Sequence, residues 1–113
     1  MREPVKDKGR LEHILKAIDN IERFLQNVPR ESFRADEVLY YAIVKNIEII
    51  GEAAYMLTPE FREEHTSVDW RSIIAMRHVL VHGYYQLSEQ EIWDTAKYNL
   101  PPLREQIEAF IKL

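Results

Sequence analysis

The chain has 113 residues, a length that suits one domain with a single hydrophobic core. Hydrophobic residues make up 46% and charged residues 30%, as in ordinary globular proteins, while 3 glycines and 5 prolines supply little of the turn chemistry that an all-β fold needs. The formal net charge of −4 argues against a general nucleic-acid coat, so any nucleic-acid role must depend on a local cluster of residues.

The chain contains no cysteine. This excludes disulfides, thiolate zinc sites and cysteine nucleophiles, and it is consistent with a reducing compartment. The first residues lead into no apolar run, so we expect no signal peptide, and no stretch approaches the length of a membrane span. The expected location is therefore the cytoplasm.

Apolar residues recur at three- and four-residue steps and predict three helices in the first half of the chain, at about residues 8–28, 36–57 and 59–64. The first helix should end near Pro29, and Asp36 is the expected N-cap of the second. Thr58 followed by Pro59 predicts the third start, since a capping residue precedes a proline at the first helical position.

A fourth helix is predicted over about residues 69–82, with Ser67 or Asp69 as its cap and Gly83 as its stop. Ser88 with Glu91 forms a capping box for the last helix.

Pro101 and Pro102 should interrupt that last helix, but the apolar residues on both sides of them keep one phase, so we expect a kinked, continuous element. No repeat or internal linker is found. The predicted fold is a single all-α domain over residues 1–113, an up-and-down bundle of four to five helices.

Two polar residues fall within the apolar stripes of predicted helices. On a helical wheel Arg77 lies in the middle of one apolar arc, and Asn46 lies in the middle of another. Because a buried charge is costly unless it is paired, a polar pocket shared by the two helices is one interpretation. The alternative is structural: Arg77 snorkels, or it bonds Asn46 and backbone carbonyls as a core contact.

The second helix carries a further apolar strip around Gly51. Glycine in a helix interior costs roughly 1 kcal/mol relative to alanine, which the close approach of another helix would explain. A helix that is apolar on two sides lies either at the centre of a bundle or at a subunit interface. In a chain this short, we favour an interface between two copies.

His78 and His82 are four residues apart and share one helix face, a spacing that suits a metal. Valine at position 79 breaks the metalloprotease pattern, and no histidine stands three residues after a glutamate, as the di-iron motif requires. We therefore expect no metal and no cofactor. Serine catalysis and a glycine-rich phosphate loop also find no support.

With metal, serine and phosphate-loop chemistry set aside, the candidate functional residues are Arg77, His82 and Tyr84, in the pattern R-x4-H-x-Y. Histidine titrates near neutral pH and acts as a general base or acid, while arginine holds phosphate and stabilises the charge of a pentavalent transition state. RNA supplies its own nucleophile, the 2′-OH. In-line displacement needs a base and an acid on opposite sides of phosphorus, and two copies of His82 in a dimer would provide them.

With their flanks, these residues resemble the HepT-like family of the HEPN superfamily, the minimal ribonuclease toxins of prokaryotes. The matching stretches are "AIVKNIEIIGEAAYML", "VDWRSIIAMRHVLVHGYY" and "IWDTAKYNLPPL". The resemblance implies a homodimer that cleaves RNA in a cleft at the dimer interface.

The resemblance also assigns roles to residues. It implies that Arg77 and His82 are the catalytic pair, and that Asn46, His78 and Tyr84 support the cleft. It further implies an MNT-type nucleotidyltransferase as the cognate antitoxin, which adenylylates Tyr84.

Arg77 and His82 are five residues apart, about 140° around an ideal helix. They can therefore face one phosphate only if the helix distorts near Gly83, the arginine curls, or the partner subunit supplies one of them. Two other functions remain open: a non-catalytic helical dimer that binds a nucleotidyltransferase or a nucleotide, and a metal-dependent helical hydrolase.

Overall fold

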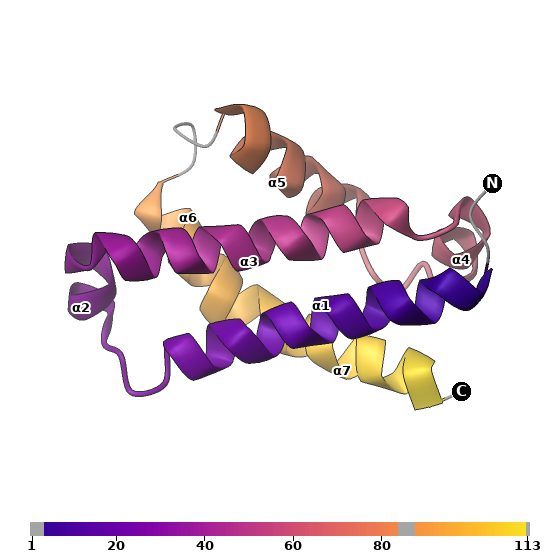
Figure 1. Cartoon of the computed structure of the whole chain (residues 1–113), viewed down its shortest axis with the longest axis horizontal. Coiled ribbons are helices and arrows are strands. Elements are labelled where there is room, and N and C mark those ends of the chain that lie inside the picture. The colour runs from indigo at the N-terminus through magenta and orange to yellow at the C-terminus, as the bar shows by residue number, and fades with distance from the viewer. Residues whose placement is uncertain (1–3, 84–87, 113) are drawn as a thin grey trace.

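The computed structural model describes residues 4–83 and 88–112, and all of its regular elements are helical. In chain order they are α1 (Pro4–Phe24), α2 (Arg30–Ala35), α3 (Glu37–Met56), α4 (Pro59–Glu64), α5 (Trp70–Gly83), α6 (Glu89–Asp94), a π-helical segment (Thr95–Asn99) and α7 (Leu100–Lys112) (Figure 1). The predicted all-α class is confirmed. No helix in the described ranges has both the length and the apolar character needed to span a membrane.

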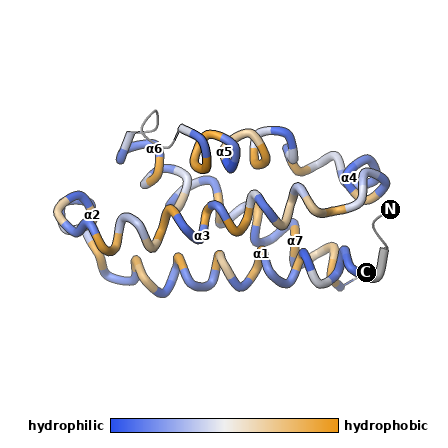
Figure 2. Tube along the Cα trace, turned by 45° about the horizontal axis from the view of Figure 1, so that its top comes forward, coloured by the Kyte–Doolittle hydropathy of each residue, from blue (hydrophilic) through white to orange (hydrophobic). Residues whose placement is uncertain are grey.

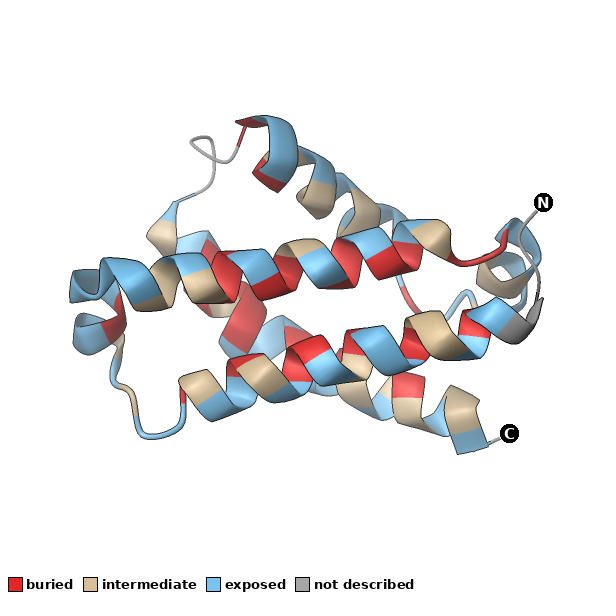
Figure 3. Cartoon of the chain, in the orientation of Figure 1, coloured by how far each residue is buried: buried red, intermediate tan, exposed pale blue. Residues whose placement is uncertain are grey.

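The central helix is α3, which packs against α1 on one side and α5 on the other, while α7 packs along α1 (Figure 1). Apolar and polar residues alternate along each long helix, and the buried positions lie on the faces that meet (Figures 2 and 3). The largest fully buried side chains come from all the main elements: Ile14, Ile18, Ile21, Phe33, Ile43, Leu57, Leu80, Ile92 and Ile107.

Local capping signals set the helix starts as predicted. The Asp36 carboxylate accepts a hydrogen bond from the Leu39 backbone N–H, and the Thr58 hydroxyl accepts one from the Phe61 N–H. Asp69, rather than Ser67, caps α5, since its carboxylate accepts the Ser72 N–H. The capping box at the start of α6 is present. The predicted stop after Gly83 involves residues 84–87, which lie outside the described residues.

The first helix differs from its prediction at both ends, since α1 spans Pro4–Phe24. It ends early because Asn27 takes a positive φ of 60°, which closes a turn after the helix. Near its start, the Asp7 carboxylate is buried and accepts hydrogen bonds from both the backbone N–H and the hydroxyl of Thr58, each at 2.8 Å. This contact ties the beginning of α1 to the start of α4.

Helix α2 was not predicted and brings the count above the expected four to five helices. Its six residues, "RESFRA", are too short to show a helical period. The helix is held by tertiary packing, because Phe33 is fully buried and its ring lies 5.3 Å from that of Trp93 and 5.9 Å from that of Tyr40. Packing of this kind is not visible in a local pattern.

The last element is continuous, as predicted, but its irregularity precedes the prolines. Residues 95–99 form a π-helical turn in which the Leu100 N–H donates to the Thr95 carbonyl, and α7 then includes Pro101 and Pro102. The ring of a proline inside a helix clashes with the backbone carbonyl of the preceding turn, and proline has no backbone N–H to donate. The wider π turn accommodates both defects without ending the helix.

A cluster of charges joins α2 to the start of α6. Glu89 accepts hydrogen bonds from Arg30 at 2.8 and 3.0 Å and from Arg34 at 3.1 Å. The hydrogen bonds from Arg30, followed by that from Arg34, lower the pKa of Glu89 below its ordinary value. A carboxyl whose folded pKa is lowered stabilises the fold above its unfolded pKa and loses that contribution as the pH falls through the folded pKa.

We therefore expect Glu89→Gln to be less stable than the wild type at pH 7. The difference should shrink as the pH falls below about 4.3, the ordinary glutamate pKa, and vanish below the lowered pKa of the folded protein. Urea unfolding at a series of pH values measures it. Glu105→Gln, an exposed position on α7, is the control and should show no such trend. An equal difference at pH 7 and pH 3 would contradict this role for Glu89.

Candidate functional site

The site is organised by the close approach of α3 and α5 at Gly51. A Cβ atom built on Gly51 would collide with the Cβ of Arg77, and would lie 2.9 Å from the Arg77 Cγ and 3.2 Å from the Ile73 carbonyl oxygen. The close approach inferred from the sequence is therefore present, but the approaching helix belongs to the same chain. Gly51 is thus explained without a subunit interface, and the argument for a dimer must come from other residues.

This approach holds Arg77 against α3. The Arg77 side chain is 27% exposed, and its Nη2 lies 2.8 Å from the Glu52 carboxylate. Its guanidinium carbon also lies 5.8 Å from the centre of the Tyr55 ring. Because Glu52 is half exposed, this ion pair adds little stability, at most about 1 kcal/mol. Its main effect is to orient the guanidinium.

Asn46 makes its contacts on another side of α3. It is buried, its amide donates to the Ala42 carbonyl at 2.9 Å, and its oxygen accepts a hydrogen bond from Asn20 of α1 at 3.1 Å. Asn46 and Gly51 are separated by about 140° around the helix. The structure therefore brings Asn46 to α1, while Arg77 meets α3 at Gly51. The two do not share these contacts.

His78 and His82 are both exposed on α5, and their ring centres lie 4.8 Å apart. The helix remains regular from residue 70 to 83, so no distortion brings His82 round to the side of Arg77. Arg77 instead bends towards Glu52, leaving His82 facing outward. Of the three ways to bring this pair to one phosphate, helix distortion is not seen up to Gly83, and residues 84–87 lie outside the described residues. Tyr84 lies outside the described residues.

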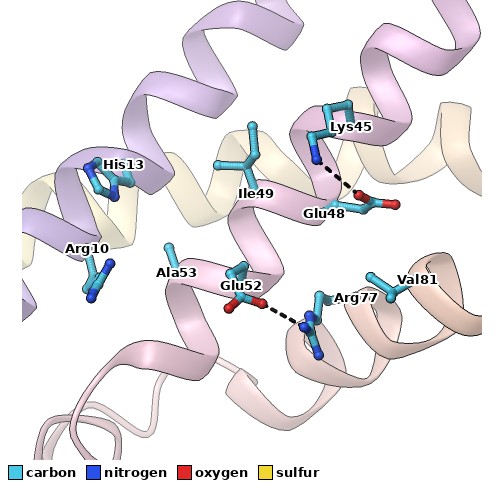
Figure 4. A pocket seen from close by; sticks show the side chains of 9 residues that line it. All are labelled: Arg10, His13, Lys45, Glu48, Ile49, Glu52, Ala53, Arg77 and Val81. Carbon is cyan, nitrogen blue, oxygen red and sulfur yellow. Dashed lines mark ion pairs between the residues drawn. The ribbon is translucent and has the colours of Figure 1, made fainter. Parts of the chain in front are cut away.

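An open pocket of about 400 Å³ lies beside Arg77, between α1, α3 and α5. Figure 4 shows Arg77 on α5 at one side and Arg10 and His13 on α1 at the other, with α3 between them. The lining residues are Arg10, His13, Lys45, Glu48, Ile49, Glu52, Ala53, Arg77 and Val81. Its three cations and two carboxylates leave one net positive charge, in a chain whose net charge is −4.

An exposed apolar face adjoins this pocket. It comprises Val38, Tyr41, Ile49 and Tyr55 of α3 with Val81 of α5, and Val38 is 82% exposed. The four α3 positions fall within an arc of about 120°, which also carries the charged residues Lys45, Glu48 and Glu52. Exposed apolar side chains interspersed with charged ones in this way occur in non-obligate protein–protein interfaces.

Sequence patterns did not identify Glu52, Arg10, His13 or Lys45 as site residues. Glu52 stands directly after Gly51, and its place in the stretch "IGEAA" was the available signal. The pairing of Glu52 with Arg77 joins two helices, and Arg10 and His13 come from a third, so no single helical wheel reveals them. In residues 4–83 and 88–112 there is no group of three or more His, Asp or Glu side chains placed to hold a metal ion.

Comparisons with known proteins show the family to which the chain belongs. A family model described as "Ribonuclease HepT-like" matches residues 14–110. A protein of Caldanaerobacter subterraneus that is provisionally named an RNase is 37% identical, with 90% of this chain and 91% of the relative covered. A protein of Thermococcus cleftensis named a probable ribonuclease HepT is 33% identical, and the match covers 93% of this chain and 96% of the relative. A provisionally named RNase of Methanocaldococcus jannaschii is also 33% identical, and the match covers 96% of this chain and 91% of the relative. No solved structure matches significantly.

Proposed function

The chain belongs to the HepT-like ribonuclease family, and from this premise we propose that it is a metal-independent endoribonuclease that acts as the toxin of a toxin–antitoxin pair. The observation that carries the proposal is the environment of Arg77. Its half-buried guanidinium is oriented by Glu52 beside an open cationic pocket, five residues before the exposed His82. A fixed cation and a solvent-accessible imidazole are the groups that phosphodiester cleavage needs.

In the proposed reaction, one His82 removes the proton from a ribose 2′-OH. The 2′-oxygen attacks the adjacent phosphorus, and the bond from phosphorus to the 5′-oxygen breaks. A second His82, protonated, donates its proton to that leaving oxygen. Arg77 binds a non-bridging phosphate oxygen and stabilises the negative charge that develops there. The products are a 2′,3′-cyclic phosphate and a 5′-hydroxyl, and no protein nucleophile is required.

Two copies of His82 imply a homodimer, and the exposed apolar face supports one. In a two-fold dimer the same surface meets itself, so a face that carries Tyr41, Ile49 and Val81 would be buried by its own copy. His82 lies on α5 next to Val81. The two histidines would then approach each other near the symmetry axis, with each Arg77 on the adjoining pocket.

Light scattering at micromolar concentration should accordingly give about twice the 13.5 kDa mass of one chain. Ile49→Asp should shift the protein to a monomer, because it buries a charge in the apolar contact. Tyr98→Asp alters an exposed aromatic on the π-helical segment and should leave the dimer intact. A wild-type monomer, or equal behaviour of the two variants, would contradict the proposed interface.

The activity itself is tested by incubating RNA with the purified protein in the presence of EDTA. Cleavage should persist, since the proposed chemistry uses only protein groups and the 2′-OH. Activity that disappears in EDTA and returns with Mg²⁺ would favour the metal-dependent hydrolase. Binding of a nucleotidyltransferase or a nucleotide without any cleavage of RNA would favour the non-catalytic helical dimer.

Regulation is proposed to come from a nucleotidyltransferase antitoxin of the MNT type. Such an enzyme would transfer AMP from ATP to the Tyr84 hydroxyl and release pyrophosphate. Tyr84 stands two residues after His82 in the sequence. The phosphate of the added AMP would compete with an RNA phosphate for Arg77, and its base would fill the cleft. This inhibition requires no change of fold.

Co-expression with a neighbouring nucleotidyltransferase should therefore raise the mass of the protein by one or more AMP units and silence cleavage. Peptide mass spectrometry should locate AMP on Tyr84. Tyr84→Phe should escape modification and keep part of the activity, whereas Tyr98→Phe should be modified like the wild type. AMP on another residue, or no mass increase, would refute this regulation even if the ribonuclease activity stands.

A further inference from the structure

The pocket beside Arg77 extends well beyond the proposed cleavage site. It crosses α3 and ends at Arg10 and His13, on the helix that contributes nothing to the R-x4-H-x-Y pattern (Figure 4). Lys45 stands on α3 at the same pocket. Three helices thus bring basic side chains to one depression of about 400 Å³, a volume within the range of ligand pockets.

The two carboxylates of this pocket already have cationic partners. Glu52 binds Arg77 at 2.8 Å, and the Glu48 carboxylate lies 3.7 Å from the Lys45 Nζ. Among the residues that the structure describes, no carboxylate lies within ion-pair distance of Arg10 or His13. The α1 end of the pocket is therefore its more positive end, while the Arg77 end is balanced by Glu52.

We propose that Arg10 and His13 at the α1 end of the pocket, together with Lys45 farther along α3, form a second phosphate-binding site, which holds backbone phosphates of the RNA strand next to the one bound at Arg77. This inference rests on the proposed ribonuclease function. The strand would run from Arg77 on α5 across α3 to α1, along the edge of the dimer face, where Ile49 and Val81 border both the pocket and the contact between the two copies.

The chemistry favours a phosphate over a base. Arg10 and Lys45 supply positive charge and His13 can donate a ring N–H, while the apolar lining consists of Ile49, Ala53 and Val81, with no Phe, Tyr or Trp ring for a base to stack on. Such a site reads the backbone and not the sequence. It would let an acidic protein bind RNA through a local positive strip despite its overall charge.

The test measures the salt dependence of binding to a 2′-O-methyl RNA oligonucleotide, whose blocked 2′ position prevents cleavage. The slope of log K against log salt concentration becomes shallower by about 0.7 for each single-strand phosphate that the protein no longer neutralises. Arg10→Ala and Lys45→Ala should each reduce the slope by about that amount. Arg10→Lys, which keeps the charge, should restore most of it.

Lys8→Ala is the matched control, because it removes one positive charge from the same helix and lines a different pocket. Its slope should equal that of the wild type. Cleavage of ordinary RNA gives a second readout: Arg10→Ala should raise KM and leave kcat nearly unchanged, since this site lies away from the reacting phosphorus. Thermal unfolding checks that the four variants are equally folded.

The two proposals fail in different ways. Wild-type cleavage combined with equal slopes for Arg10→Ala, Lys45→Ala and Lys8→Ala would overturn the second phosphate site alone. Reduced slopes in a protein that cleaves no RNA would overturn the ribonuclease function and leave a phosphate site on an RNA-binding protein.

Discussion

Replacing His82 with alanine should lower RNA cleavage by roughly 10²–10⁴-fold, the range expected when a general acid–base is removed. His82 is exposed on α5 and packs in no core cluster, so the fold should persist. Single-turnover cleavage and circular dichroism on the same sample measure both outcomes. Because each proposed site uses two copies of His82, the substitution removes both the base and the acid.

His78→Ala is the matched control for this prediction. His78 is also exposed, and its ring lies 4.8 Å from that of His82 on the same helix. It should reduce activity much less, because it supports the cleft without moving a proton. Equal losses for the two histidines would assign the chemistry to the pair. Full activity of His82→Ala would remove this residue from the mechanism.

Adding a single methyl group at Gly51 should destabilise the protein by about 1–3 kcal/mol, the usual cost of overpacking a core. The effect is opposite to helix propensity, which favours alanine over glycine by roughly 1 kcal/mol. The new Cβ would meet the Cβ of Arg77 and lie 3.2 Å from the Ile73 carbonyl oxygen. Neither is the far end of a flexible side chain, so α3 and α5 must move apart.

Gly9→Ala provides the control, since nothing lies within 4 Å of a Cβ built on Gly9 of α1. This change should raise the free energy of unfolding by about 0.5–1 kcal/mol. Urea unfolding compares the two variants directly. Gly51→Ala should also reduce RNA cleavage more than Gly9→Ala, because it displaces Arg77. Stabilisation by alanine at both positions would contradict the packing of α5 on α3.

Features of the fold that depend on neighbours in sequence were predictable. The helix starts were predictable because each capping side chain bonds a backbone group only three residues away. This holds for Asp36, Thr58 and the Ser88–Glu91 capping box. Helix α2 was missed, since Phe33 is held by rings from other elements. The π-helical turn was also missed, because the sequence shows that prolines must be accommodated but not how.

The candidate site likewise has residues that the sequence pattern identified and residues that only the packing of helices brings in. Arg77 and Gly51 each stood out as a residue at odds with its helix face, and the structure shows them in contact. The sequence indicated that some helix approaches Gly51 closely, but a helical wheel contains no information on which one. For that reason a subunit interface was favoured over α5. Glu52, Arg10 and His13 join the site only through the packing of three helices.

The most direct test of the proposed chemistry is the identity of the RNA ends that the protein leaves. RNA is incubated with the purified wild-type protein in EDTA, and the fragments are analysed by mass spectrometry. Attack by the 2′-OH, with His82 as base and acid and Arg77 on the phosphate, predicts a 2′,3′-cyclic phosphate on one fragment and a 5′-hydroxyl on the other. Cleavage that requires added Mg²⁺ and leaves 5′-phosphates would contradict it.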